Sequence, residues 1–178
     1  MSGIIGQNVG RSSGLKKAIA AAGNTPYFLA HRGADGCSGD GCTQSTSDNT
    51  FTKAQFNGER LDTDNCYDPS TYRFTPNKAG KYLVYITCNI DSSHGFYYAS
   101  SEVKKNGSNI SGARITNIFE NLSSSDNVIE GIFLSYHGIV EMNGSSDYLT
   151  ATAYMAGSSG AGNIKGNRTI WGAYRLRS

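Results

Sequence analysis

Residues 81–90, KYLVYITCNI, alternate in the manner of a β-strand more clearly than any other segment of the chain. One side of this segment is suited to a core. The other side is half apolar, because Leu83 and Tyr85 occupy positions that would normally face water. We therefore expect a second layer to cover this side too, and a neighbouring subunit is one candidate. The core-facing side carries Tyr82, Val84, Ile86, Cys88 and Ile90.

Other short segments with the same alternation follow one another, separated by turns rich in Gly, Asn and Ser. Asn106 and Gly107 are typical of a tight hairpin turn. No heptad or internal repeat is present, so about eight strands predict an all-β antiparallel sandwich or jelly roll. The segments are 25–32, 50–56, 95–103, 127–142, 147–155 and 169–176. In 50–56, one side carries Phe51, Lys53 and Gln55 and the other carries Thr50, Thr52, Ala54 and Phe56; in 127–142, one face carries Val128, Ile132, Leu134, Tyr136 and Val140. In 147–155, the expected inward residues are Leu149, Ala151, Ala153 and Met155, and the expected outward residues are Tyr148, Thr150, Thr152 and Tyr154.

The composition of the chain supports an all-β fold and also suggests that the protein forms an oligomer. The chain of 178 residues suits one domain, and its 22 glycines and 11 tyrosines favour short strands joined by turns. Hydrophobic residues make up only 38 % of the chain, which suggests that a partner chain completes part of the core.

Residues 1–24 differ from the rest and are interpreted as an extended docking arm before a domain at 25–178. The arm carries Arg11, Lys16 and Lys17 and no acid, whereas the remaining 13 basic and 14 acidic residues give a net charge of −1. Such a basic arm is expected to dock on an acidic surface, and an ordinary solvated tail is the alternative. Three charges without interleaved aromatics are too few for nucleic acid. We expect no membrane span and no secretory signal, and therefore synthesis in a cytoplasm without secretory export.

Four cysteines leave three possibilities open. Free thiols are the first expectation, a disulfide between Cys37 and Cys42 is the second, and a zinc site that includes His31 is the last. Cys66 has no assigned role, and Cys88 is expected to be a small core residue.

The stretch from residue 56 to residue 82 carries a spaced pattern of aromatics that resembles the signature of the complement C1q/tumour necrosis factor (TNF) superfamily. The signature positions are Phe56, Asp62, Tyr67, Phe74, Gly80 and Tyr82, and Val84 and Ile86 stand where the pattern has two further aromatics. VKKNGS, SSDYLTA and IWGAYRL resemble flanking strands of that family, so the resemblance covers about residues 25–178. It implies an antiparallel jelly roll that assembles as a homotrimer, with Leu83 and Tyr85 at or near the subunit interface.

A second resemblance concerns the arm. MSGIIGQNVGRSSGLKK is similar to the opening of virion structural proteins of marine tailed bacteriophages. This implies a protein of the virion surface that leaves the host by lysis. Its partners would be other proteins of the capsid or tail, with no nucleic acid and no membrane.

Chemistry-bearing residues are sparse. His31, His94 and His137 lie in different segments without a nucleophile motif, so no catalytic residue, enzyme activity or cofactor is expected. Asp62, Asp64 and Asp68 are weak calcium candidates, because some members of the superfamily bind calcium and hard cations prefer oxygen ligands. A turn or capping hydrogen bond is the preferred role for Asp62.

Aromatic residues near turns offer a possible ligand surface. The candidates are His94, Phe96, Tyr97 and Tyr98, in a loop at 92–98, with further loops at 121–127 and 156–167; plain connections are the alternative. We expect a non-enzymatic trimeric head fixed to the phage particle by its arm in a decoration or cement-like role. A tail-fibre or tail-tip protein that binds a host surface glycan or protein is the alternative.

Overall fold

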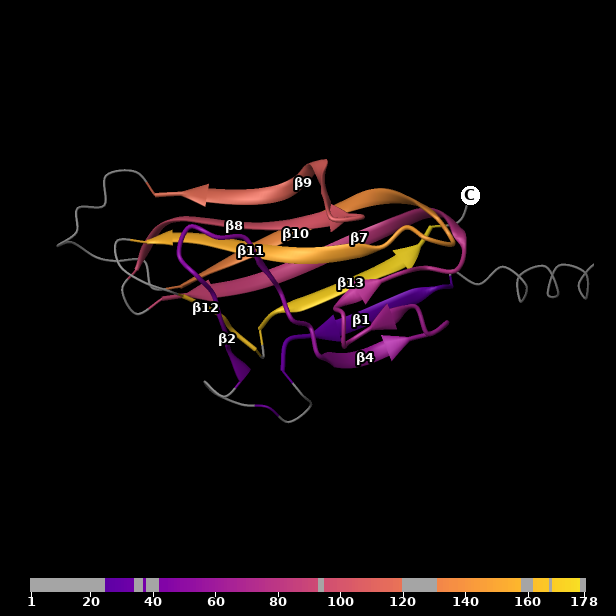
Figure 1. Ribbon diagram of the computed structural model, residues 1–178, viewed down its shortest axis with the longest axis horizontal. Helices are drawn as coiled ribbons and strands as arrows, with labels where there is room; N and C mark the ends of the chain where they lie inside the picture. The colour runs from indigo at the N-terminus through magenta and orange to yellow at the C-terminus, as the bar shows by residue number, and fades with distance from the viewer. Residues whose placement is uncertain are drawn as a thin grey trace, which may run out of the picture.

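The computed structural model describes residues 25–33, 37, 42–92, 95–119, 131–157, 162–166 and 168–176. The proposed arm, with Arg11, Lys16 and Lys17, lies outside the described residues. Two antiparallel sheets pack face to face, as Figure 1 shows. Within the described part of the chain, no helix is long and apolar enough to cross a membrane.

The seven-stranded sheet is built around β7 (Ala79–Asp91). On one side β7 pairs with β10 (Gly131–Asn143) along its whole length, and on the other it pairs with β13 (Ile170–Arg175). β1 (Tyr27–His31) joins β13 and then β4 (Gly58–Asp62), which is an edge strand. The short strands β12 (Asn163–Ile164) and β2 (Gln44–Ser45) complete the sheet beyond the first residue of β13.

The six-stranded sheet has β11 (Leu149–Gly157) beside β8 (Phe96–Lys105), which in turn pairs with β9 (Ser108–Ile118). On its other side β11 pairs with β3 (Thr52–Lys53) and β6 (Arg73–Phe74), and β6 pairs with β5 (Tyr67–Asp68). The predicted Asn106–Gly107 turn is confirmed, because both residues have positive φ and join β8 to β9.

The core between the sheets is aromatic, and it explains the even spacing of the signature. The Phe28 ring stacks on Phe74 at 4.4 Å and on Tyr67 at 4.8 Å, and Trp171 meets Phe28 edge-on at 5.0 Å. Phe56 completes the cluster against Trp171 at 5.5 Å. Rings from five separate segments therefore share one buried site, and edge-to-face and offset pairs of this kind add to the energy of burial.

The inward residues predicted for β7 and β11 are confirmed, because each of them is at most 1 % exposed. The backbone at position 80 requires glycine, because its φ is +145° and a Cβ there would lie 3.0 Å from the Arg175 Nε.

Other expectations are corrected. Only Thr52–Lys53 of the segment 50–56 is paired, and the long strand β9 was not predicted as a segment of its own. Thr150 and Thr152 do face outward, but neighbouring side chains bury both of them. The structure joins Cys37 and Cys42 in a disulfide, contrary to the first expectation of free thiols, whereas Cys66 and Cys88 are free and buried.

The two ends of the described chain meet. The backbone N–H of Arg175 donates to the Pro26 carbonyl at 3.2 Å, and Tyr27 is in register with Tyr174. Figure 1 shows these ends at the opposite pole of the sandwich from the beginnings of β8 and β10.

Candidate assembly face

The outer face of the seven-stranded sheet carries large apolar side chains on β1, β4, β7, β10 and β13, beside polar ones such as Thr87 and Ser135, and we call it the assembly face. It begins with Leu83 and Tyr85, which point away from the core because their neighbours on β7 point into it. Five large side chains on adjacent strands lie on the same face and are exposed in the single chain. They are Tyr27 (37 %), Leu61 (51 %), Phe133 (52 %), Ile139 (61 %) and Tyr174 (37 %).

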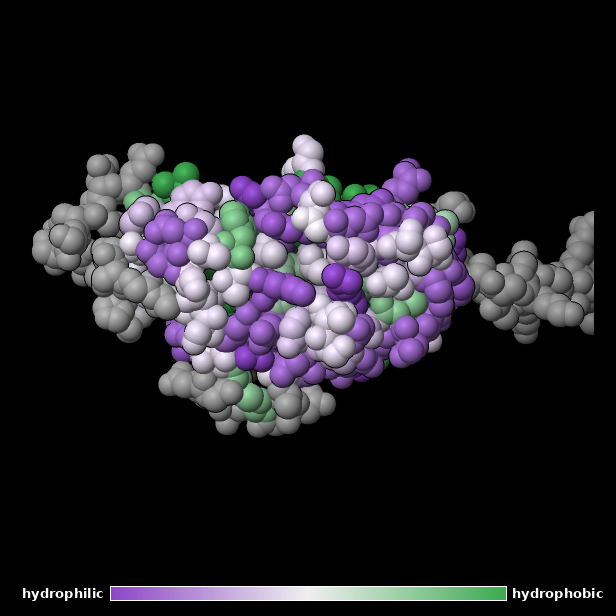
Figure 2. Space-filling model, viewed as in Figure 1, coloured by the Kyte–Doolittle hydropathy of each residue, from purple (hydrophilic) through white to green (hydrophobic). Residues whose placement is uncertain are grey.

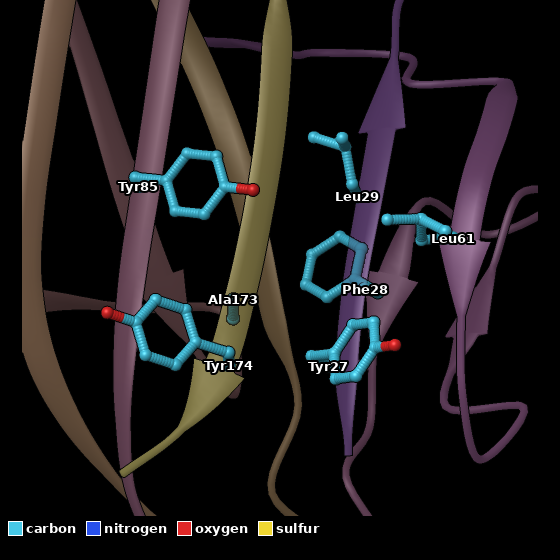
Figure 3. Close-up of a pocket in the computed structure, with 7 residues that line it drawn as sticks. All are labelled: Tyr27, Phe28, Leu29, Leu61, Tyr85, Ala173 and Tyr174. Atoms are coloured by element: carbon cyan, nitrogen blue, oxygen red, sulfur yellow. The ribbon is translucent and has the colours of Figure 1, made fainter. Parts of the chain in front are cut away.

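A groove of about 300 Å³ crosses this face between β13 and β1. Figure 3 shows Tyr85 and Tyr174 on one side of it and Tyr27, Leu29 and Leu61 on the other. Phe28 and Ala173, both at most 1 % exposed, form its floor. The groove is therefore apolar on its walls as well as on its floor.

Gly172 makes this groove possible. It lies on β13 in register with Tyr85, and a Cβ at this position would overlap the Tyr85 ring and hydroxyl. The same Cβ would lie 2.8 Å from the Phe28 carbonyl oxygen. Because glycine leaves this space open, the Tyr85 ring extends from β7 across β13 toward the groove, as Figure 3 shows. Burial raises the pKa of the Tyr85 hydroxyl, and the nearby Tyr174 adds to this effect.

The sequence identified only part of the assembly face. Leu83 and Tyr85 are on it, whereas Leu61, Phe133 and Ile139 were not singled out. Ile139 could have been found, since it is directly opposite Leu83 once β10 is paired with β7. His137 is exposed on the same face, in register with Tyr85.

The predicted ligand residues do not form one loop, which is a correction. Phe96, Tyr97 and Tyr98 are the first residues of β8, because this segment pairs with the end of β11. Phe96 is buried against Phe119 at 6.0 Å, so it is closed to a ligand. Tyr98 is half-buried against Tyr154.

Tyr97 alone of these three aromatics is exposed, at 46 %. His94 lies outside the described residues. So do residues 121–127, and residues 158–161 and 167 of the loop at 156–167.

Each of the three acids considered for calcium forms hydrogen bonds or an ion pair with different residues. Asp62 accepts hydrogen bonds from the backbone N–H groups of Cys66 (3.0 Å) and Tyr67 (2.8 Å), which confirms its capping role. Asp64 pairs with Lys78 at 3.0 Å. Among the described residues, no group of three or more His, Cys, Asp or Glu side chains could hold a metal ion.

Asp68 is engaged in a local turn. It accepts hydrogen bonds from the hydroxyls of Ser70 and Thr71 and from the Ser70 N–H, and these bonds lower its pKa to about 2. Its oxygens serve the turn that leads into β6. The structure therefore does not bring Asp62, Asp64 and Asp68 together as a ligand set.

The two described histidines lie apart. His31 is buried on β1, and its ring lies over Gly58, where a Cβ would overlap it. His137 is exposed on β10, on the assembly face.

Comparisons with known proteins bear on the fold. No protein-family model matches the sequence, and no curated protein matches it. Solved structures do match. The globular domain of zebrafish complement 1qA aligns with a TM-score of 0.53 at 12 % identity over 86 % of this chain and 98 % of its own.

Two TNF-type structures are similar to the same extent. Murine APRIL aligns with a TM-score of 0.54 at 14 % identity, over 84 % of this chain and 99 % of its own. Eiger TNF from S. frugiperda aligns with a TM-score of 0.58 at 13 % identity, over 86 % and 95 %. The chain thus has the antiparallel jelly-roll fold of C1q and TNF domains, as its spaced aromatics predict.

Proposed function

We propose that this protein is a non-enzymatic structural and interaction module that assembles as a homotrimer through the assembly face. The apolar outer face of the seven-stranded sheet is the observation that carries this proposal. Polar residues normally cover the solvent side of an antiparallel sheet, whereas here large apolar side chains occupy it on β1, β4, β7, β10 and β13. Contiguous apolar surface of this kind is typical of protein interfaces, and obligate interfaces resemble a core.

Symmetry explains how copies of this one chain can cover one another's assembly faces. A closed ring of identical copies buries the same surface on every subunit, so no copy is left with an exposed apolar sheet. The groove beside Tyr85 offers a recess for a side chain of the neighbouring copy. The likeness in fold to C1q and TNF domains supports a trimer over other closed rings.

The experiment is analytical ultracentrifugation of the full chain and of two matched variants. Tyr85→Asp places a charge in the assembly face, and Tyr97→Asp places the same charge on an exposed tyrosine of the other sheet. We expect trimers of the wild type and of Tyr97→Asp, and monomers of Tyr85→Asp. A Tyr85→Asp variant that sediments as a stable trimer would refute the proposal.

We further propose that the trimer is a head on the surface of a tailed-phage virion, held there by residues 1–24 in a decoration or cement-like role. The resemblance of the first 17 residues and the charge of Arg11, Lys16 and Lys17 support this proposal. Deletion of residues 1–24 should leave a folded head that no longer joins the particle. Particles that still acquire the deleted form would exclude a docking arm.

A tail-fibre or tail-tip protein that binds a host surface glycan is the second candidate. The exposed side chain of Tyr97 favours it, since a half-exposed aromatic at the pole opposite the chain ends is placed to meet a ligand. Electron microscopy of particles labelled through the head separates the two, because a label on the tail supports the second candidate and a label on the capsid the first.

A further inference from the structure

Asn57 and Gly58 lie where the chain enters β4, and an Asn–Gly pair is chemically reactive. The backbone nitrogen of the second residue can attack the side-chain carbonyl carbon of the asparagine and close a five-membered succinimide ring. Glycine favours this reaction, because it has no side chain to obstruct the approach. The chain has three such pairs, which are Asn57–Gly58, Asn106–Gly107 and Asn143–Gly144.

The side-chain amide of Asn57 is held through its oxygen. The Asn57 Oδ1 accepts hydrogen bonds from the backbone N–H of Gly33 at 2.8 Å and from the Arg32 guanidinium at 3.0 Å. Among the hydrogen bonds that the described residues form, none has the Asn57 Nδ2 as its donor. The oxygen is therefore fixed, whereas the nitrogen, which must leave as ammonia, is not retained by these contacts.

Arg32 is fixed in position for its contact with Asn57. A second nitrogen of its guanidinium donates to the Thr43 carbonyl at 2.8 Å, and its backbone N–H donates to the Thr169 carbonyl at 3.0 Å. Attack on the carbonyl carbon of Asn57 places negative charge on Oδ1, where a cation and a backbone N–H already donate. Donors fixed around an oxygen that gains charge lower the barrier of such a step, as they do in an oxyanion hole.

The fold accepts only glycine after Asn57. A Cβ at position 58 would overlap the ring of His31 and the carbonyl oxygen of Gly33. Larger residues, which would slow the ring closure, are therefore excluded by the packing. Asn57 itself is exposed on a molecule whose coloured surface is mostly hydrophilic, as Figure 2 shows, so water can reach it.

The other two Asn–Gly pairs are held differently. The Asn106 Nδ2 donates to the Asp147 carboxylate at 2.8 Å, and its Oδ1 accepts from the Tyr148 N–H at 2.9 Å. The Asn143 Nδ2 donates to the Ser146 hydroxyl at 2.9 Å, and its Oδ1 accepts from three backbone N–H groups of the following turn at 3.0 Å. Among the hydrogen bonds of the described residues, no cation donates to either oxygen. Both ends of each amide are fixed, so neither can turn toward the glycine nitrogen without losing hydrogen bonds.

We propose that Asn57 is a self-modification site, at which the folded protein converts this asparagine to aspartate or isoaspartate. The Gly58 nitrogen gives its proton to water and forms a bond to the Asn57 Cγ. The bond from Cγ to Nδ2 breaks, and the nitrogen takes up a proton and leaves as ammonia. Water then opens the succinimide at either carbonyl, so the reaction needs no oxidant, metal or second protein. It does not depend on the oligomeric state or on the location of the protein.

The aspartate product fits the site that forms it. A carboxylate at position 57 can accept the same two hydrogen bonds, and the bond from Arg32 becomes charge-assisted. The formal net charge of the chain falls by one, from +2 to +1. Because the departure of ammonia makes the step irreversible, the converted fraction increases with the age of the folded protein.

Incubation of the full chain at neutral pH, followed by proteolytic digestion and mass spectrometry, measures deamidation at all three pairs in one sample. In the native protein, Asn57 should convert at least about tenfold faster than Asn106 and Asn143. Arg32→Gln should slow the conversion of Asn57 about tenfold, because it removes one oxyanion donor. Arg60→Gln, the control of equal net charge, removes an exposed arginine of β4 and should leave the rate within about twofold.

A reference in urea shows what the fold contributes. The three pairs should convert there at similar rates, since each has glycine as its second residue and the native contacts are lost. If Arg32→Gln unfolds, conversion at Asn106 and Asn143 will accelerate as well. The wild type then decides alone, because Asn57 must convert at least as fast in the folded protein as in urea.

Four results would overturn the proposal. Native conversion of Asn57 no faster than that of the other two pairs excludes an activated site, and so does a wild-type rate below that in urea. A folded Arg32→Gln variant with the wild-type rate would show that the Arg32 contact only holds the chain. Fragments that end at residue 57 would show attack of the side-chain nitrogen on the main chain, which cleaves the protein in place of deamidating it.

Discussion

Gly172→Ala tests how the assembly face is constructed. The new methyl group would occupy the space of the Tyr85 ring and would lie 2.8 Å from the Phe28 carbonyl oxygen. The backbone oxygen is held by the β1–β13 ladder, in which Leu29 is opposite Gly172. The Tyr85 side chain must therefore move, and its ring leaves the wall of the groove.

Two opposing effects set the size of the change. Overpacking at a well-packed site costs about 1–3 kcal/mol. Replacing glycine by alanine where the strand backbone is unstrained stabilises the protein by about 0.4–1 kcal/mol, because alanine lowers the conformational entropy of the unfolded chain. The net loss is about 1–2 kcal/mol, and for a chain of this size it lowers the melting temperature by about 2–8 °C.

Thermal unfolding followed by circular dichroism, at one protein concentration, measures this loss for Gly172→Ala, Tyr85→Ala and the double variant. Tyr85→Ala removes the ring that the methyl group meets, so Gly172→Ala should cost less in that background, by about 0.5 kcal/mol or more. Gly131→Ala on β10 is the control, because its Cβ would have no neighbour nearer than 3.7 Å. Equal costs of Gly172→Ala in both backgrounds would refute the steric reasoning.

Three further outcomes follow from the core, one carboxylate and the thiols. Phe28→Ala should lower the free energy of unfolding by about 3–5 kcal/mol in urea titration, since it empties the centre of the aromatic cluster; a loss below about 1 kcal/mol would contradict that packing. Hydrogen bonds led by that of Lys105 lower the pKa of Asp147 to about 2, so stability should hold above about pH 4 and fall toward pH 2. Asp147→Asn should flatten this fall in melting temperature, and an unchanged profile would exclude the linkage. Burial raises the pKa of Cys66, and that of Cys88 to about 12, so iodoacetamide at pH 8 should label neither in the native protein; rapid native labelling would contradict their burial.

The fold was predictable where side-chain spacing alone decides burial. β7 was identified because its inward side has no polar interruption. Phe56, Tyr67 and Phe74 were identified because their spacing lets each contribute a ring to the same core. β9 was not, because it is an edge strand with mostly exposed residues and no hydrophobic period.

Sites that depend on contacts between distant segments were less accessible. Phe96 looked like a loop aromatic, and its burial depends on Phe119 at the far end of β9. The burial of Thr152 depends on Glu102, whose own burial depends on Arg114. Sequence alternation reports which side of a strand faces in, but it cannot report which neighbour covers the other side.

The meeting of the two chain ends has a mechanical consequence. A force applied between residues 25 and 176 would separate β1 from β13 at the pole where both ends lie and would open their ladder one pair at a time. A head held by its N-terminal side and pulled from the opposite pole would instead load β1 along its axis. Hydrogen bonds to both β13 and β4 would then resist together in shear. A tether before residue 25 thus places the load in the direction in which this fold is strongest.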